Sequence, residues 1–250
     1  MEQIGNMRFE LGNRIKFCRD YIKFKAQSKV SSEKFTFGKF FPCLRDWNDS
    51  SGIASGHYFH QDLLVAQKIF ANNPLKHVDI GSRIDGFVAH VASFREIEVI
   101  DVRPLQSKIK NIEFKQIDFM EDNSSVGSYS DSISCLHALE HFGLGRYGDP
   151  VDFDGYMKGF KNLTHMLNPG GLLYFSVPIG EQRIEFNAHR VFSVQYLLDL
   201  FRDEFSVKTF SYVDDRGDLH EDVSLREEDV ASNFSCTYGC GIFELIKDET

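Results

Sequence analysis

The sequence lacks several features that would place it in a specialised class of protein. No apolar run approaches the 18 or so residues of a membrane-spanning helix, and residues 1–10 lack the apolar core of a secretion signal. The five cysteines are odd in number, scattered and without a CxxC pair. We therefore expect no disulfides, no structural zinc, and a cytoplasmic location. Positive charge is scarce as well: 28 lysines and arginines against 37 acids leave a net charge of −9, which disfavours nucleic acid as a partner.

What remains is the composition of an ordinary globular chain. The 250 residues are 42% hydrophobic and 26% charged, which suits one large α/β domain, alone or with an extension. Charge is distributed unevenly, because residues 1–45 carry ten Lys or Arg against four Asp or Glu. That balance of +6 leaves residues 46–250 at −15.

The basic front of the chain has helical periodicity. Leu11, Ile15, Cys18 and Ile22 recur at helical spacing with basic residues between them. We expect a helix that packs on the core and exposes a basic face; contact with an acidic membrane surface or a partner is the alternative. The predicted organisation is a basic helical extension over residues 1–55 and a main domain over residues 56–250.

Helices and strands alternate from residue 60 onward, which predicts an α/β fold. The final two strands follow one another without a long helix between them, which indicates an antiparallel end to a parallel sheet. Helices are predicted at residues 62–71, 87–94, 154–167 and 193–201, and strands at residues 78–80, 98–102, 113–117, 132–136, 172–178, 205–213 and 241–247.

One strand–turn–helix–strand unit carries the signal for a nucleotide. His77-Val-Asp-Ile-Gly-Ser-Arg-Ile-Asp-Gly86 reads as a buried strand and a glycine-bearing turn, and a second strand ends at Asp101, 22 residues after Asp79. In open α/β sheets this arrangement places a nucleotide over the strand ends, with a carboxylate available to the ribose hydroxyls.

The order of elements resembles the class I S-adenosylmethionine-dependent methyltransferases over residues 56–247. The resemblance implies a Rossmann-like, seven-stranded, mostly parallel sheet with an antiparallel last strand and helices on both faces. Asp79-Ile-Gly81 is similar to the family's first motif, Asp101 to its ribose-binding acid, and Asp118 to the acid that commonly faces adenine. Leu167-Asn-Pro-Gly-Gly-Leu-Leu173 is similar to the turn before strand five.

Two further segments resemble a little-characterised branch of methyltransferase-like proteins: residues 138–149 (ALEHFGLGRYGD) and 186–190 (FNAHR). That branch implies the fold and the cofactor more than the substrate. The first loop departs from the family, because Arg83 and Asp85 stand between Gly81 and Gly86 where small residues are usual. The same loop lacks the GxGxxG spacing of nicotinamide and flavin enzymes, which disfavours a dehydrogenase.

A site for S-adenosylmethionine needs a carboxylate that accepts hydrogen bonds from the ribose hydroxyls. It also needs an apolar pocket with one polar group for the adenine, and no cation beside the sulfonium. Aromatic faces attract a cationic sulfur, and a helix N-terminus favours the methionine carboxylate. The predicted cofactor-binding residues are Tyr58, Gln61, Asp79, Gly81, Asp101, Asp118, Phe119 and His137.

Methyl transfer to oxygen or nitrogen requires a group that accepts a proton. His141 follows strand four and His189 follows strand five, so either is a candidate base. Arg146 and Arg190, with the adjacent Glu140, are predicted to hold an anionic acceptor. A metal set drawn from the polar residues of the 137–152 segment matches no ligand spacing, and no metal is expected.

Two functions follow from these residues. The first is an S-adenosylmethionine-dependent methyltransferase acting on a small, anionic or sugar-like acceptor, in surface polysaccharide or other carbohydrate modification. The second is a non-catalytic nucleotide- or metabolite-binding protein, or a partner subunit of an assembly, on the same fold. The acceptor, the methylated atom and the oligomeric state are not predicted.

Overall fold

A computed structural model describes residues 2–121 and 127–249, and its chain divides into two units, Met1–Ile53 and Ala54–Thr250. The first unit holds α1 (Glu2–Val30), which contains the predicted helix, and a short turn η1 (Asp46–Asn48). Within this unit the ring of Phe17 packs edge-on against that of Phe40, with 5.1 Å between centroids. Among residues 2–121 and 127–249, no helix is both long and apolar enough to cross a membrane.

The second unit carries the alternating elements that the sequence predicts, with several short additions. In chain order they are α2 (His57–Asn72), β1 (His77–Ile80), η2 (Ile84–Val88), α3 (Ala89–Ala92), β2 (Ile97–Asp101), β3 (Ile112–Gln116), β4 (Ser130–Leu136), η3 (Leu139–His141), α4 (Gly155–Met166), β5 (Leu167–Ile179), β6 (Arg183–Glu185), β7 (His189–Val191), α5 (Val194–Phe201), β8 (Phe205–Val213), β9 (Leu219–His220), α6 (Glu227–Ala231), η4 (Asn233–Ser235) and β10 (Gly239–Lys247).

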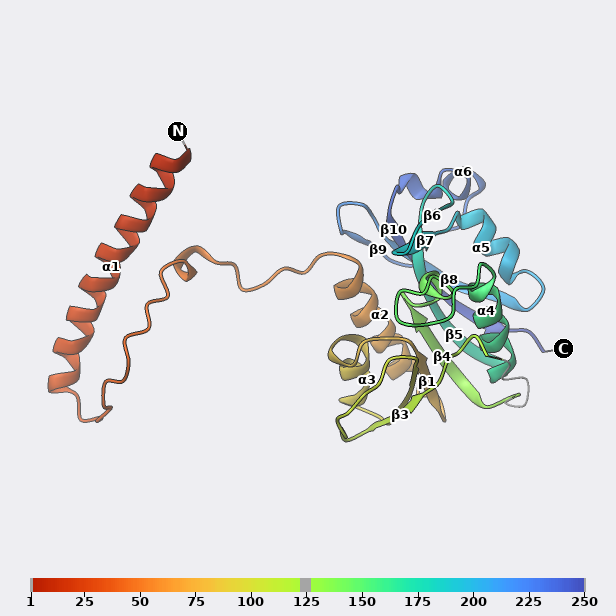
Figure 1. The fold of residues 1–250 in the computed structure, drawn as a ribbon, viewed down its shortest axis with the longest axis horizontal. Coiled ribbons are helices and arrows are strands. Elements are labelled where there is room, and N and C mark those ends of the chain that lie inside the picture. The colour runs from red at the N-terminus through yellow and green to blue at the C-terminus, as the bar shows by residue number, and fades with distance from the viewer. Residues whose placement is uncertain (1, 122–126, 250) are drawn as a thin grey trace. The chain divides into compact units, whose positions relative to one another are not determined.

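The main sheet has the order β3-β2-β1-β4-β5-β10-β8-β9 (Figure 1). Strands β1 to β5 pair in parallel, whereas β10 is antiparallel to both β5 and β8. The last strand of the chain is therefore the reversed one, as predicted. Because β1 and β4 are neighbours while the chain runs outward from β1 to β3, the strand order reverses between them, and open α/β sheets bind ligands at such a point.

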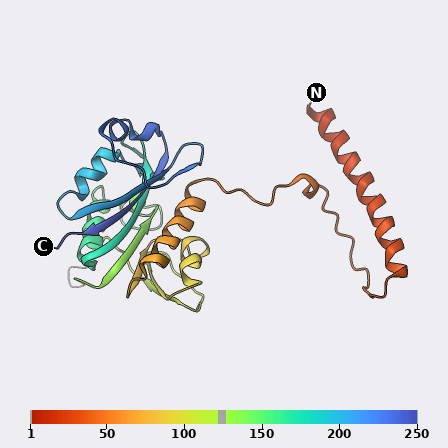
Figure 2. The ribbon, with the colours of Figure 1, turned by 180° about the vertical axis from the view of Figure 1, so that it is seen from behind.

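Helices cover both faces of the sheet, and each face has its own apolar core (Figures 1 and 2). Side chains of β1 such as Val78 and Ile80 pack with those of α4 and α5, including Phe160 and Phe201. On the other face, Val99 of β2 packs with residues of α2 and α3. Burial on both faces explains why the central strands read as short apolar runs rather than alternating ones.

The structure differs from the sequence prediction in several places. The sheet has eight strands rather than seven, because the two-residue strand β9 pairs with β8, and β6 and β7 form a separate ribbon. The helix predicted at 87–94 is a π-type turn followed by the short α3, because Gly86 adopts a non-helical conformation. Strand β5 begins at Leu167 rather than at residue 172, since a register shift in its pairing with β4 absorbs the intervening turn.

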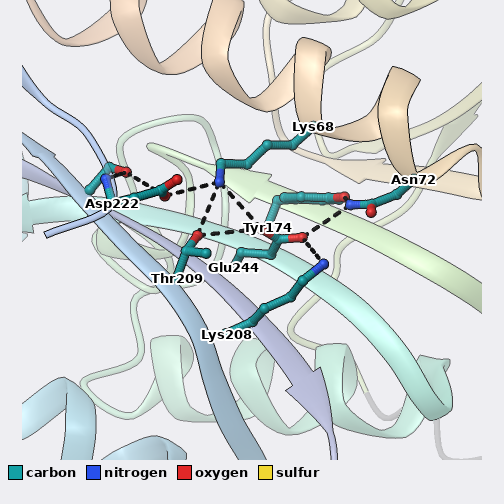
Figure 3. Close-up of polar contacts among 8 residues, drawn as sticks. Lys68, Asn72, Tyr174, Lys208, Thr209, Asp222 and Glu244 are labelled. Atoms are coloured by element: carbon teal, nitrogen blue, oxygen red, sulfur yellow. Dashed lines mark hydrogen bonds and ion pairs between the residues drawn. The ribbon is translucent and has the colours of Figure 1, made fainter. Parts of the chain in front are cut away.

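A polar network fixes the end of α2 that lies away from the sheet's ligand-binding edge (Figure 3). The ammonium of Lys68 lies 3.1 Å from Thr209 Oγ1 and 3.4 Å from Glu244 Oε2. The amide of Asn72 donates to the Tyr174 hydroxyl at 2.6 Å and to Glu244 Oε1 at 3.0 Å. Because Glu244 is buried and fully paired, the network ties α2 to β5, β8 and β10. The opposite end of α2 is thereby held in a fixed position over the sheet.

Candidate functional site

A cavity of about 430 Å³ opens where β1, β2 and β4 end. Its walls come from the first turn of α2, the loop after each of these strands, and the segment that follows β3. This volume is typical of small-molecule sites. Of the thirteen predicted site residues, eight line the cavity: Tyr58, Gln61, Gly81, Asp101, Asp118, Phe119, His137 and His141.

The loop after β1 approaches the cavity through Gly81. This residue has φ +81°, and a Cβ atom there would lie 2.8 Å from the Cβ of Ala138. Glycine is therefore required both for the backbone conformation and for the close approach of the two loops. Arg83 and Asp85, the bulky departures from the family pattern, pair with each other at 2.7 Å and keep largely exposed side chains. Both side chains lie at the rim of the cavity.

Asp79 lies outside the cavity, although the sequence predicts it to bind cofactor. Its side chain is fully buried beneath the loop, where it accepts hydrogen bonds from the Ser82 amide (3.0 Å) and hydroxyl (2.8 Å) and from the Ser134 hydroxyl (2.5 Å). The carboxyl group therefore shapes the turn that carries Gly81 rather than touching a ligand. Burial outweighs these hydrogen bonds and raises the pKa of Asp79 to about 7.

This raised pKa predicts a stability that falls as the pH rises. The unfolded chain loses the Asp79 proton near pH 3.9, whereas the folded chain keeps it until about pH 7. Between these values the folded state binds one more proton, so the free energy of unfolding decreases by about 4 kcal/mol from this group. Asp79→Asn removes the titration, and its urea-unfolding curves should lack this contribution between pH 4 and 7.5. An exposed control, Asp85→Asn, should follow the wild type; parallel curves for all three proteins would contradict the burial argument.

Asp101 stands at the end of β2 with its carboxylate on the cavity wall. Arg103 donates hydrogen bonds to both oxygens of this carboxylate. Its backbone amide and Nε donate to Oδ1 at 2.8 and 3.0 Å, and its Nη2 donates to Oδ2 at 2.5 Å. The same Nη2 donates to the Gly81 carbonyl at 3.0 Å, and the guanidinium lies 4.8 Å from the ring centroid of Tyr147. A carboxylate paired in this way is fixed in orientation.

The segment after β3 supplies a half-buried acid and an apolar surface. Asp118 Oδ1 accepts a hydrogen bond from the Met120 amide at 2.9 Å, which sets the direction of the side chain. The buried Phe119 is anchored through its carbonyl, which accepts from Asn162 Nδ2 at 2.7 Å. The pairing of one carboxylate with an aromatic wall suits a flat heterocycle that carries an amino group.

The first turn of α2 places Tyr58 and Gln61 on the opposite wall. The ring of Tyr58 is tilted against His137, with centroids 5.2 Å apart. The buried amide of Gln61 is already engaged, because its Nε2 donates to Asp62 at 2.9 Å and its Oε1 accepts from Ser176 at 2.5 Å. One N–H of this amide remains to donate to a ligand.

His141 lines the cavity in a defined tautomer. Its Nδ1 lies 2.7 Å from the Ala188 carbonyl, and since a carbonyl only accepts, Nδ1 carries the proton and Nε2 carries the lone pair. Burial lowers the pKa of His141, while the neighbouring Glu140 opposes the shift. The imidazole is therefore neutral at physiological pH and able to accept a proton.

The remaining predicted residues lie outside the cavity for identifiable reasons. The buried Arg190 donates to the carbonyls of Phe142 (2.7 Å) and Phe153 (3.0 Å), so it joins two loops instead of facing a substrate. Glu140 is buried against His137 at 2.8 Å. His189 lies 3.2 Å from Glu185, and the exposed Arg146 donates to the Ala188 carbonyl at 2.9 Å.

Sequence reasoning missed several residues of this region. Arg103 and Tyr147 line the cavity and Ser82 fixes its first loop, yet none was selected. The position of Arg103 two residues after Asp101 was a usable signal, because a bidentate pair forms readily across such a turn. Tyr147 lies within the predicted glycine-bearing loop, but no periodicity marks the direction of its ring.

The family of the chain follows from a profile described as "Caenorhabditis protein of unknown function, DUF268", which matches residues 88–236. The chain belongs to the DUF268 family. The DUF268 match includes Asp101, Asp118 and the two loops at 138–149 and 186–190, whereas the Gly81 loop precedes it. No curated protein sequence matches the chain.

Several solved structures that match the fold of this chain are methyltransferases. The N-methyltransferase NodS from Bradyrhizobium japonicum WM9, solved with S-adenosylhomocysteine, is 13% identical with a TM-score of 0.52, and the match covers 78% of this chain and 89% of NodS. A Burkholderia thailandensis 1,6-didemethyltoxoflavin N1-methyltransferase, also with S-adenosylhomocysteine, is 14% identical with a TM-score of 0.54 over 76% and 79% of the two chains. The [4+2]-cyclase SpnF is 14% identical with a TM-score of 0.55 over 76% and 82%. These likenesses establish the fold, and the cyclase illustrates that this fold serves more than one reaction.

Proposed function

We propose that this chain binds S-adenosylmethionine in the cavity and transfers its methyl group to a small acceptor. The observation that carries the proposal is the carboxyl group of Asp101 on the cavity wall at the end of β2, beside the glycine-bearing loop after β1. A ribose diol offers two hydroxyl donors to such a carboxylate. Structural neighbours solved with S-adenosylhomocysteine support the same cofactor.

Each of the other cavity walls would contact a different part of the cofactor. Asp118 would accept from the adenine amino group while Phe119 packs on the ring, and Gln61 would donate to the methionine carboxylate at the first turn of α2. The face of Tyr58 would lie by the sulfonium, an attraction of about 1–2 kcal/mol when desolvated. His141 would then act as the base that takes the proton from the acceptor as the methyl group arrives.

The acceptor is proposed to be small and sugar-like or anionic, in carbohydrate modification. Two neighbouring loops carry exposed aromatic rings, Tyr147 and Phe153 on one and Phe186 on the other, and the loops are joined because Arg190 bonds the Phe153 carbonyl. Of these rings Tyr147 lines the cavity, and its exposed face suits the apolar side of a sugar. The exposed Arg146 suits an attached phosphate or carboxylate. We assign Arg190 no part in binding the acceptor, because its guanidinium is buried and donates to the backbone carbonyls of Phe142 and Phe153.

The second candidate is a non-catalytic binder of a nucleotide or metabolite. One observation favours it: Arg103 already engages both oxygens of Asp101, the group that a ribose would use. The two candidates differ in what they bind and in whether a methyl group leaves the cofactor.

Calorimetry on the 250-residue chain tests the proposal. S-adenosylmethionine and S-adenosylhomocysteine should each bind at one site in the micromolar range, and NAD should give no heat, because the first loop lacks the dinucleotide spacing. Binding of S-adenosylhomocysteine without any transfer of labelled methyl to a panel of nucleotide sugars and sugar phosphates would favour the non-catalytic candidate. An absence of heat with both methionine cofactors at millimolar concentration would end the methyltransferase proposal.

A further inference from the structure

Three potential metal ligands from distant parts of the sequence meet beside the cavity. His57 is the first residue of α2, His137 follows β4, and Cys240 lies in β10. One ring nitrogen of each histidine and the Cys240 sulfur all lie within 4.8 Å of one another. His137 and Cys240 are buried and His57 is half-buried, so the cluster is not a chance grouping of solvated surface residues.

His137 is arranged as a metal-binding histidine is. Its Nδ1 lies 2.8 Å from Glu140 Oε1, and because a carboxylate only accepts, Nδ1 carries the proton. Its Nε2 is buried and has no hydrogen-bond partner within the described part of the chain, so this is the ring nitrogen left to bind a metal. Histidines that bind metals commonly donate their other N–H to a carboxylate in this way.

Two buried polar atoms of His137 and Glu140 have no hydrogen-bond partner among the described residues. A purely structural role for these two residues does not explain why both atoms are left without one. Besides His137 Nε2, the second oxygen of Glu140 lacks a hydrogen-bond partner among residues 2–121 and 127–249. A buried polar atom without a partner destabilises the folded state, because it has lost its hydrogen bonds to water. A bound cation would satisfy the His137 lone pair and, through the imidazole, would offset the charge of the buried carboxylate.

The three ligand atoms would have to move only slightly closer together to bind one ion. Tetrahedral zinc with nitrogen ligands at about 2.0–2.1 Å and sulfur at about 2.3 Å keeps its ligand atoms about 3.3–3.6 Å apart. The rings of His57 and His137 lie nearly parallel, at 10° with centroids 5.2 Å apart, so one ring must turn to face the same ion. His57 is the less buried of the two and stands at the start of its helix, which makes it the ring that moves.

We propose that His57, His137 and Cys240 bind a divalent transition-metal ion, with Glu140 holding His137 in position. Two imidazoles and one thiolate suit Zn²⁺, and three protein ligands leave a fourth position for water or another oxygen, nitrogen or sulfur ligand. The site goes beyond the proposed methyl transfer and does not depend on it. It also gives His137 a different role from the predicted contact with the cofactor.

Metal binding by the untagged 250-residue chain tests the site. Cys18 and Cys43 are exposed and would bind metal on their own account, so every protein carries Cys18→Ser and Cys43→Ser. After treatment with a chelator, Zn²⁺ is titrated against a competing indicator, and Co²⁺ is titrated by absorbance, which reports cobalt bound to a thiolate. We expect one equivalent of each metal and a cobalt–thiolate absorption band.

Variants and matched controls separate this site from incidental binding. His57→Ala, at a half-buried position, and Cys240→Ala should each weaken Zn²⁺ binding at least about 100-fold, and Cys240→Ala should abolish the cobalt–thiolate band. His60→Ala, on the same helix, and Cys135→Ala, buried in β4, should bind as the parent does. Circular dichroism and the melting temperature of the metal-free proteins confirm that each variant folds.

Three results would overturn the site: no stoichiometric metal in the parent, binding unchanged in folded His57→Ala, or an equal loss in the controls. Titration of S-adenosylhomocysteine into the metal-free parent runs alongside. This titration reports on the cofactor site at Asp101 and not on the metal ligands. Failure of the metal site would therefore leave cofactor binding intact, whereas failure of the proposed function would leave metal binding intact.

Discussion

Replacement of His141 by asparagine is expected to lower the turnover number about 10²- to 10⁴-fold, the usual contribution of a positioned base. Asparagine keeps a donor toward the Ala188 carbonyl but has no basic nitrogen at the position of Nε2. The affinity for S-adenosylmethionine should change by less than about twofold, because the loss falls on the chemical step. The measurement is the transfer of labelled methyl to the best acceptor of the panel, with cofactor affinity determined by calorimetry.

The pH profile of the wild type provides an internal check on this role. Since burial lowers the pKa of His141, turnover should rise from acid pH with its midpoint below the usual histidine value of about 6.5. The exposed His165→Asn is the matched control and should keep both the turnover and the profile. A His141→Asn enzyme with wild-type turnover, or one that loses cofactor affinity to the same extent, would remove His141 from the role of base.

Replacement of Asp101 by asparagine should weaken the binding of S-adenosylmethionine and S-adenosylhomocysteine about 10- to 100-fold. A hydrogen bond to a charged group contributes about 1.5–3 kcal/mol, and asparagine leaves only one weaker acceptor for the ribose hydroxyls. It also removes the ion pair with Arg103, so the guanidinium loses its anchor at the cavity wall. Calorimetry on the folded variant measures the change.

Asp85→Asn is the matched control for Asp101, because it also lies on the cavity rim but pairs with Arg83 in solvent. Its cofactor affinity should equal that of the wild type. Equal losses in the two variants would indicate a general effect of negative charge at the mouth rather than a ribose contact.

The sheet could be predicted from the sequence because its central strands are buried on both faces. Short apolar runs such as residues 132–136, separated by glycine and proline turns, carry that signal directly. Strand β8 occupies the predicted range Phe205–Val213, and the Ser193 hydroxyl caps α5 by accepting from the Tyr196 amide. The π-type turn at Ile84–Val88 was not predictable, because its cause is the local conformation of Gly86 rather than a periodic pattern.

The candidate site was predictable where a residue's place follows from the end of a strand. Asp101 is the last residue of β2 and Asp118 lies just beyond β3, and both reach the cavity because these parallel strands end at the same edge of the sheet. Side-chain direction is the information that the sequence lacks. Asp79 turns under its loop to meet Ser134, and Arg190 turns inward to meet backbone carbonyls, although both lie next to strand ends.

Long-range clusters lie beyond spacing rules altogether. His57, His137 and Cys240 come together only because α2 covers the face of a sheet in which β4 and β10 flank β5. Ligand-spacing patterns detect sites built within one segment, so the absence of a CxxC pair did not bear on this cluster.

The most direct test of the central claim is a crystal structure of the full chain soaked with S-adenosylhomocysteine. The ribose diol should lie within hydrogen-bond distance of the Asp101 carboxylate, with the adenine between Asp118 and the Gly81 loop. Density for the ligand at another place, or a cavity that stays closed by the Asp101–Arg103 pair at saturating ligand, would contradict the account.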